Sequence, residues 1–114
     1  MFFALRVVDT FNDKSDLENH VRRDRKTLVL FCASWCPFCR EFFSVFDGLV
    51  RKQDFDRVLR VYIDDYDNQL WDDFSIEAVP TVVLFEQGKA TRRLDAQLGF
   101  GLEEETFRDW LKKT

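Results

Sequence analysis

Two cysteines separated by two residues offer the clearest chemistry in this sequence: Cys36 and Cys39, in the segment Trp35-Cys36-Pro37-Phe38-Cys39. Two thiols at this spacing can interconvert between a dithiol and a disulfide. If the pair opens a helix, the helix N-terminus stabilises a thiolate on the first cysteine. A metal site needs about four ligands, and the chain offers one further cysteine and one histidine. The pair therefore predicts thiol–disulfide redox chemistry.

Composition and charge limit the classes of partner and the kind of protein in which this chemistry takes place. The chain has 114 residues, and its net charge of −4 gives no electrostatic footprint for nucleic acid or an anionic membrane. Residues 1–9 are typical of a strand rather than of a secretory signal, and no segment approaches the ~18 apolar residues that a membrane helix needs. Three cysteines do not make a disulfide scaffold. We expect a single domain over residues 1–114, monomeric and cytoplasmic, that binds neither nucleic acid nor membrane.

Hydrophobic periodicity predicts the elements that position the cysteines. Residues 27–33 form a continuous apolar run, typical of a strand covered on both faces. Ser15-Asp16-Leu17-Glu18 is a capping box with Ser15 as N-cap. The expected strands are 3–8, 27–33, 58–64, 81–85 and 90–94, with a hairpin turn at 86–89. The expected helices are 15–23, 41–52 and 103–113, and residues 68–74 form a short helix or a turn. This order predicts an α/β protein with a central mixed β-sheet flanked by helices on both faces.

The order of elements, with a Cys-x-x-Cys pair after the second strand, resembles the thioredoxin fold. Four segments are similar to the thioredoxin family: Phe31-Cys32-Ala33-Ser34-Trp35-Cys36, Val61-Tyr62-Ile63-Asp64, Ala78-Val79-Pro80-Thr81, and Val82-Val83-Leu84-Phe85 through Gly88. Together they extend over nearly the whole chain. The resemblance implies a thioredoxin-like fold and thiol–disulfide oxidoreductase activity.

The resemblance also implies roles for the two cysteines. Cys36 is expected to be the nucleophile that attacks a substrate disulfide, and Cys39 is expected to resolve the resulting mixed disulfide. The redox-active disulfide is then Cys36–Cys39. The expected catalysis needs neither a bound cofactor nor a metal.

Residues around the pair are expected to bind the substrate, again by resemblance. Pro80 is expected to follow a cis peptide bond and to face the cysteines, with the backbone of Val79 pairing with the substrate. Trp35 is expected at the rim of the groove, and Pro37 and Phe38 at the active-site turn. Gly99 is the candidate for the family's glycine on the far side of the groove.

The sequence departs from the family in three places. Leu30 occupies the position of a buried aspartate, so Cys39 must lose its proton to water or to another group. Arg60 stands at the position of the partnering lysine and would lower the pKa of any thiol near it. The dipeptide Pro37-Phe38 replaces Gly-Pro and is closer to the Pro-Tyr of glutaredoxins, although residues 81–114 lack a glutaredoxin's Gly-Gly.

Two further groups have plain structural explanations. Cys32 alternates with Leu30 along the predicted strand, which favours a buried, inert thiol. The five aspartates between positions 64 and 73 lack the glycine and terminal glutamate of a calcium loop, which favours a charged surface over a cation site.

We therefore expect an enzyme of electron transport and cell redox homeostasis that reduces protein disulfides. Its partners would be disulfide-containing proteins as substrates and a reductase or glutathione as electron donor. One alternative is a glutaredoxin-like, oxidising or isomerising variant. Another is a redox-gated protein-interaction module that uses the groove beside Pro80. The reduction potential of the cysteine pair separates reductants from oxidants.

Overall fold

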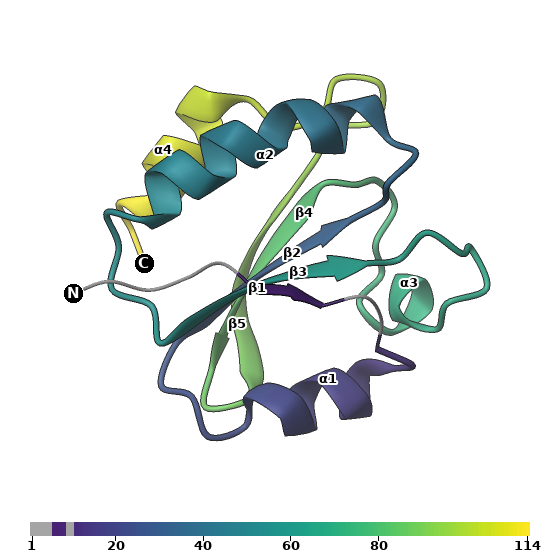
Figure 1. Ribbon diagram of the computed structural model, residues 1–114, viewed down its shortest axis with the longest axis vertical. Coiled ribbons are helices and arrows are strands. Elements are labelled where there is room, and N and C mark those ends of the chain that lie inside the picture. The colour runs from purple at the N-terminus through teal and green to yellow at the C-terminus, as the bar shows by residue number, and fades with distance from the viewer. Residues whose placement is uncertain (1–5, 9–10) are drawn as a thin grey trace.

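The computed structural model describes residues 6–8 and 11–114 and contains the expected order of elements (Figure 1). The strands are β1 (Arg6–Val8), β2 (Thr27–Cys32), β3 (Arg57–Tyr62), β4 (Thr81–Glu86) and β5 (Lys89–Asp95). The helices are α1 (Lys14–Val21), α2 (Pro37–Val50), α3 (Leu70–Asp73) and α4 (Glu104–Leu111). Residues 3–5 of the predicted first strand lie outside the described residues.

The five strands form one mixed sheet in the order β1-β3-β2-β4-β5. β2 lies at its centre, parallel to β3 and antiparallel to β4. All six residues of β2 are buried, because α2 and α4 cover one face of the sheet and α1 and α3 lie on the other (Figure 1). The prediction of a two-sided, buried strand is confirmed, and the fold is the predicted α/β arrangement.

Aromatic packing holds α2 in its place above the sheet. The ring of Phe107 on α4 lies 5.1 Å from the ring of Phe42 and 5.6 Å from that of Phe46, centroid to centroid. Such ring pairs contribute about 0.5–1.5 kcal/mol each beyond the burial of their area. On the other face, the ring of Phe31 on β2 packs 5.3 Å from that of Phe74. The helix that carries the cysteine pair is therefore fixed by its apolar side.

Two helices begin earlier in the chain than the predicted ranges. α1 begins at Lys14, because the carboxylate of Asp13 accepts a hydrogen bond from the backbone N–H of Asp16 at 2.9 Å and caps the helix two residues before the predicted cap, Ser15. α2 begins at Pro37 rather than at residue 41. Proline suits the first helical position, since its fixed φ is helical and its missing N–H would have no intrahelical partner there.

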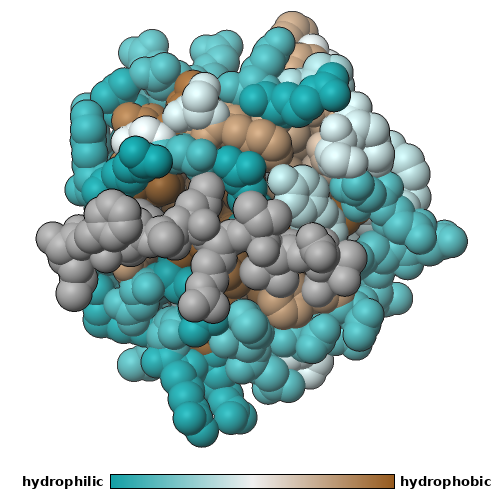
Figure 2. All heavy atoms as spheres, in the orientation of Figure 1, coloured by the Kyte–Doolittle hydropathy of each residue, from teal (hydrophilic) through white to brown (hydrophobic). Residues whose placement is uncertain are grey.

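Hydropathy differs between the surface and the interior. Figure 2 shows mainly hydrophilic side chains on the face viewed, with hydrophobic residues exposed between them in patches. Across residues 6–8 and 11–114, no helix has both the length and the apolar character needed to span a membrane.

The β4–β5 hairpin turns through Gln87 and Gly88, which have φ values of +52° and +86°. Two successive left-handed residues are the requirement of a type I′ turn, which matches the twist of the flanking strands. The predicted turn at 86–89 is confirmed, with Glu86 paired to Lys89.

Gly88→Ala is expected to lower the free energy of unfolding by about 1–3 kcal/mol. A Cβ at this position would be strained at its positive φ and would lie 2.9 Å from the Cα of Arg22. Gly48→Ala is the matched control, because it lies within α2 and a Cβ there meets no atom within 4 Å. The control should gain up to about 1 kcal/mol through helix propensity. Urea unfolding measures both, and changes of the same sign would contradict the explanation.

Candidate active site

The cysteine pair lies where β2 passes into α2. Cys36 is the N-cap of α2, with an extended backbone, and its carbonyl oxygen accepts the first helical hydrogen bond from the N–H of Arg40 at 3.3 Å. Its own N–H donates to the carbonyl of Ala33 at 3.2 Å, which forms the turn out of the strand. Cys39 follows one helical turn later and is fully buried, while Cys36 retains 6% exposure. No disulfide joins the two cysteines in this structure.

The loop before β4 lies directly against Cys36. The Cys36 thiol donates a hydrogen bond to the backbone carbonyl of Val79, with 3.7 Å between sulfur and oxygen. The Val79–Pro80 peptide bond is cis, as predicted. The Thr81 hydroxyl donates to the carbonyl of Ala78 at 2.7 Å and steadies the loop. The structure thus brings together the predicted nucleophile and the predicted substrate-pairing backbone, 43 positions apart in sequence.

Cys39 lies in an environment that keeps its thiol protonated. Burial raises the pKa of Cys39 far above the usual thiol range, and the neighbouring Cys36 raises it further. The backbone N–H of Ala33 donates to the Cys39 sulfur at 3.5 Å and lowers the pKa, but by less than burial raises it. Cys39 therefore needs a proton acceptor before it can act as a nucleophile.

The two departures at Leu30 and Arg60 lie side by side. Leu30 is fully buried and is the register partner of Arg60 across β2 and β3. The guanidinium of Arg60 pairs with the carboxylate of Asp47 on α2 at 2.9 Å and lies 4.0 Å above the ring of Phe43. Its charge lowers the pKa of Cys32, though by less than burial raises it. Arg60 therefore lowers the pKa of one thiol, that of Cys32, as expected. The net pKa of Cys32 is nevertheless raised, because burial has the larger effect.

Cys32 is enclosed in the sheet. It has no exposed surface, and its thiol donates to the carbonyl of Val61 at 3.8 Å. Burial raises the pKa of Cys32 to about 12. A thiol so protected from ionisation is a poor nucleophile, in agreement with the predicted inert role.

Cys32→Val is expected to reduce the loss of stability at alkaline pH. Because the pKa of Cys32 is raised from 9.0 to about 12 on folding, the unfolded thiol ionises first. The wild type keeps this contribution below pH 9 and loses it, at about 1.4 kcal/mol per pH unit, as the pH rises toward 12. Urea unfolding under reducing conditions at pH 8, 9 and 10 measures the difference between the two proteins. A constant difference would contradict the burial-raised pKa.

Trp35 lies at the rim beside Cys36. Its side chain is 45% exposed, and its indole N–H donates to the backbone carbonyl of Asp64 at 2.9 Å. The preceding residue, Ser34, donates to the carboxylate of Asp64 through its backbone N–H at 2.9 Å and through its hydroxyl. The segment after β3 therefore anchors the residues that lead into the cysteine pair. Pro37 is exposed next to them.

Phe38 contacts a glycine that sequence analysis did not select. The ring is half-buried, and a Cβ built on Gly101 would lie 2.9 Å from its Cδ1. A Cβ on the predicted Gly99 would meet no atom within 4 Å. Gly101, and not Gly99, therefore lies against the active-site turn, because the loop after β5 places its close approach two residues later. The loop exposes Leu98 and Phe100 instead.

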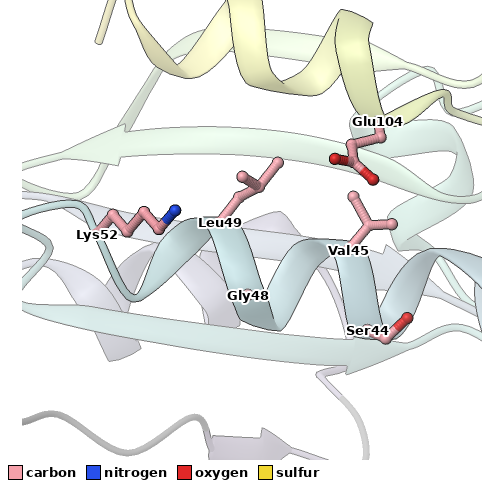
Figure 3. Close-up of a pocket in the computed structure, with 6 residues that line it drawn as sticks. All are labelled: Ser44, Val45, Gly48, Leu49, Lys52 and Glu104. Atoms are coloured by element: carbon pink, nitrogen blue, oxygen red, sulfur yellow. The ribbon is translucent and has the colours of Figure 1, made fainter.

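Two hollows lie near α2 and α4. A groove of about 340 Å³ runs between these helices and contains no sulfur; Figure 3 shows its lining residues Ser44, Val45, Gly48, Leu49, Lys52 and Glu104. A second hollow, of about 240 Å³, adjoins Phe38 through Gly101; it is lined by Asp95, Gln97, Phe100, Gly101, Leu102, Glu103 and Thr106. The two cysteines therefore lie at the N-terminal end of α2 and line neither hollow.

The predicted acidic surface is also present. Asp64 binds Ser34, Asp65 accepts from the N–H of Asp67 at 2.8 Å, and Asp73 accepts from the N–H of Lys14 at 2.8 Å. In the part of the chain that the structure describes, no three histidine, cysteine or acidic side chains gather closely enough to hold a metal ion.

Comparison with known proteins shows to which protein family the chain is similar. The family model described as Thioredoxin matches residues 7–113. Thioredoxin H1 of Arabidopsis thaliana is 33% identical over 88 residues, which cover 75% of this chain and 73% of that protein. A thioredoxin of Mycoplasmoides gallisepticum is 26% identical over 88 residues, which cover 77% and 84%. The chain spans 21% of bovine protein disulfide-isomerase A5, to which it is 26% identical over 112 residues.

Solved structures share the fold. Thioredoxin of Fasciola hepatica superposes with a TM-score of 0.70 at 24% identity, covering 96% of this chain and 98% of that one. Thioredoxin f2 of Chlamydomonas reinhardtii superposes with a TM-score of 0.74 at 16% identity, covering 96% of this chain and 95% of that one. The family match, the fold and the dithiol at the end of α2 agree, and the chain belongs to the thioredoxin family and is a thiol–disulfide oxidoreductase.

Proposed function

We propose that this protein reduces protein disulfides through the Cys36–Cys39 couple. The observation that carries the proposal is the contact between the Cys36 sulfur, at the N-cap of a 14-residue helix, and the carbonyl of Val79 in the cis-proline loop. The helix end favours negative charge on the sulfur. The loop offers backbone groups beside it with which an extended substrate segment can pair.

The reaction proceeds by two thiol–disulfide exchanges. The Cys36 thiolate attacks one sulfur of the substrate disulfide; that S–S bond breaks, a mixed disulfide forms, and the other substrate sulfur leaves as a thiolate. The Cys39 thiolate then attacks the Cys36 sulfur, which releases the second substrate thiolate and forms the Cys36–Cys39 disulfide. Two electrons pass to the substrate. The protons lost by the two enzyme thiols go to water, and the two substrate thiolates take up protons in return.

Differences in burial and contacts support different tasks for the two cysteines. Cys36 retains some exposure and faces the loop, so it is the sulfur that a substrate can reach. Cys39 is buried behind it and acts only within the mixed disulfide. Regeneration requires an external thiol reductant, supplied by a reductase or by glutathione. A reducing compartment such as the cytosol suits this direction of electron flow.

Mixed-disulfide trapping tests the proposal. Cys39→Ser removes the resolving thiol, so the reduced variant should form a stable covalent adduct with a small protein that carries surface disulfides. Non-reducing electrophoresis and mass spectrometry would locate the adduct on Cys36, and a reductant should release it. Cys36→Ser is the matched control, because it replaces the other thiol of the pair, the less buried one. No adduct in Cys39→Ser, or equal adducts in both variants, would overturn the assignment.

One observation favours a second candidate, an oxidising or isomerising enzyme. The dipeptide Pro37-Phe38 lies in the first turn of α2, where it differs from the Gly-Pro of the family resemblance and affects the stability of the thiolate. Equilibration in thiol redox buffers measures the potential. A value near about −270 mV supports a reductant, and one above about −200 mV supports the oxidising candidate. A pair that forms no disulfide would leave only a binding role.

A further inference from the structure

Beside the cysteine pair, three aromatic side chains form a continuous surface. The ring of Tyr66 lies 5.3 Å from that of Trp35 on one side and 5.3 Å from that of Trp71 on the other, centroid to centroid. Tyr66 is 71% exposed and Trp35 is 45% exposed. We call these three residues the aromatic row. In Figure 1 the segment that carries Tyr66 leads from the end of β3 to α3, on the side where β2 passes into α2.

Hydrogen bonds hold the row in place. The indole N–H of Trp35 donates to the carbonyl of Asp64, and that of Trp71 donates to the carbonyls of Ile63 and Asp65 at 3.1 and 3.2 Å. Both tryptophans are thus tied to the short segment after β3, and Tyr66 lies between them. Because the rings are already ordered, binding to them costs less conformational entropy than binding to mobile side chains.

The charge around the row is negative. The sequence from Val61 to Gly88 contains seven acidic residues and no lysine or arginine. Asp65 and Asp67 flank Tyr66 in sequence, Asp72 follows Trp71, and all three aspartates are exposed. Aromatic faces attract cations, most strongly when carboxylates stand nearby. The combination complements a basic side chain and disfavours an acidic one.

Three basic side chains from other elements could offset the negative charge around the aromatic row. The ammonium of Lys14 lies 5.5 Å above the ring of Phe74, and the guanidinium of Arg93 binds the carbonyl of Phe74 and the carboxylate of Asp95. Both therefore lie at the end of α3. Arg40 is exposed in the first turn of α2, beyond Cys39. Among the described residues, none of these three cations lies over the ring of Trp35, Tyr66 or Trp71.

We propose that the aromatic row binds an arginine or lysine side chain of the substrate, close in sequence to the disulfide that is reduced. Trp35 directly precedes Cys36, which places one end of the row next to the attacking cysteine along this chain. The basic side chain would lie against Tyr66 with carboxylates around it. This inference rests on the proposed reductase function and adds substrate selection to it.

Matched peptides test the selection. Each peptide carries one internal disulfide, and the residue next to one cysteine is arginine, its neutral isostere citrulline, or leucine, placed before the cysteine in one series and after it in another. Stoichiometric reduction by the pre-reduced protein gives a rate constant without any electron donor. We expect the arginine peptide to react about fivefold faster than the citrulline peptide in at least one series, from cation–π attraction at an exposed site. The advantage should shrink at high salt.

Variants then assign the effect to the row. Tyr66→Ala should bring the arginine-to-citrulline ratio close to one, and Tyr66→Phe should keep the ratio because it keeps the ring. Asp67→Asn should lower the ratio. Asp54→Asn is its matched control, because Asp54 precedes β3 and lies at the opposite end of the sheet from the cysteines.

The outcomes separate this inference from the proposed function. A ratio of one in the wild type, a preference for leucine over arginine, or an unchanged ratio in Tyr66→Ala would overturn the basic-side-chain assignment while leaving reduction intact. Failure to reduce any peptide would instead overturn the reductase function.

Discussion

Cys36→Ser is expected to lower the rate of disulfide reduction by at least about a thousandfold. A serine hydroxyl at the N-cap of α2 is not ionised at neutral pH and cannot form a disulfide with Cys39. The substitution is nearly isosteric, and serine is itself a preferred N-cap residue, so the fold should be retained. Turnover with a disulfide protein and an excess of dithiol regenerant, corrected for the regenerant alone, measures the loss.

Cys32→Ser is the control for this prediction. Cys32 carries the same thiol four residues earlier but is enclosed in the sheet, so its replacement should leave turnover within a few-fold of the wild type, at some cost in stability for the buried hydroxyl. Residual activity of Cys36→Ser clearly above about a thousandth of the wild-type rate would mean that another thiol can attack the substrate. Loss of activity in Cys32→Ser, with the fold intact, would give that thiol a chemical role.

The resolving step is expected to accelerate about tenfold for each pH unit between pH 6 and 9, because its rate follows the thiolate fraction of Cys39. Burial holds the pKa of Cys39 above this window, so raising the pH increases a small thiolate fraction in proportion to hydroxide. The burial that raises this pKa remains when Cys36 is tied up in a mixed disulfide, although the influence of the Cys36 charge is then removed.

A symmetric aromatic disulfide separates the two steps in a stopped-flow experiment. It releases one coloured thiol when Cys36 attacks and a second when Cys39 resolves the mixed disulfide. Cys39→Ser should release only the first, which identifies the resolving phase. A resolving rate that levels off below pH 8 would contradict the prediction and would mean that a group in the site accepts the proton.

Leu30 provides a further check on the proton route. The family resemblance places a buried acid at this position, and Leu30→Asp would restore one. The variant should flatten the pH dependence of the resolving phase, whereas Leu30→Asn should leave it unchanged. Both should cost at least about 1 kcal/mol of stability, since each buries a polar group in a fully buried position.

The local chemistry of the site was predictable from sequence because it depends on residues that are neighbours along the chain. The spacing of Cys36 and Cys39, the apolar run of β2 and the proline at position 80 each act over a few residues, and the resemblance to thioredoxins joined them into one fold. The two-residue turn at Gln87 and Gly88 was predictable for the same reason. The predicted cap of α1 was wrong because Asp13 and Ser15 are both suitable cap residues and lie two positions apart.

The surroundings of the cysteine pair were decided by contacts between distant segments. Tyr66 meets Trp35 across 31 positions in sequence, Arg60 meets Asp47 across two elements, and Gly101 rather than Gly99 reaches Phe38. No local pattern marks such partners, because propensity and periodicity act along one element whereas packing depends on how elements meet. The residue types and spacing of Cys36 and Cys39 thus predicted a dithiol, and only the packing of β2, α2 and the cis-proline loop placed the Cys36 sulfur against the Val79 carbonyl and enclosed Cys39 completely.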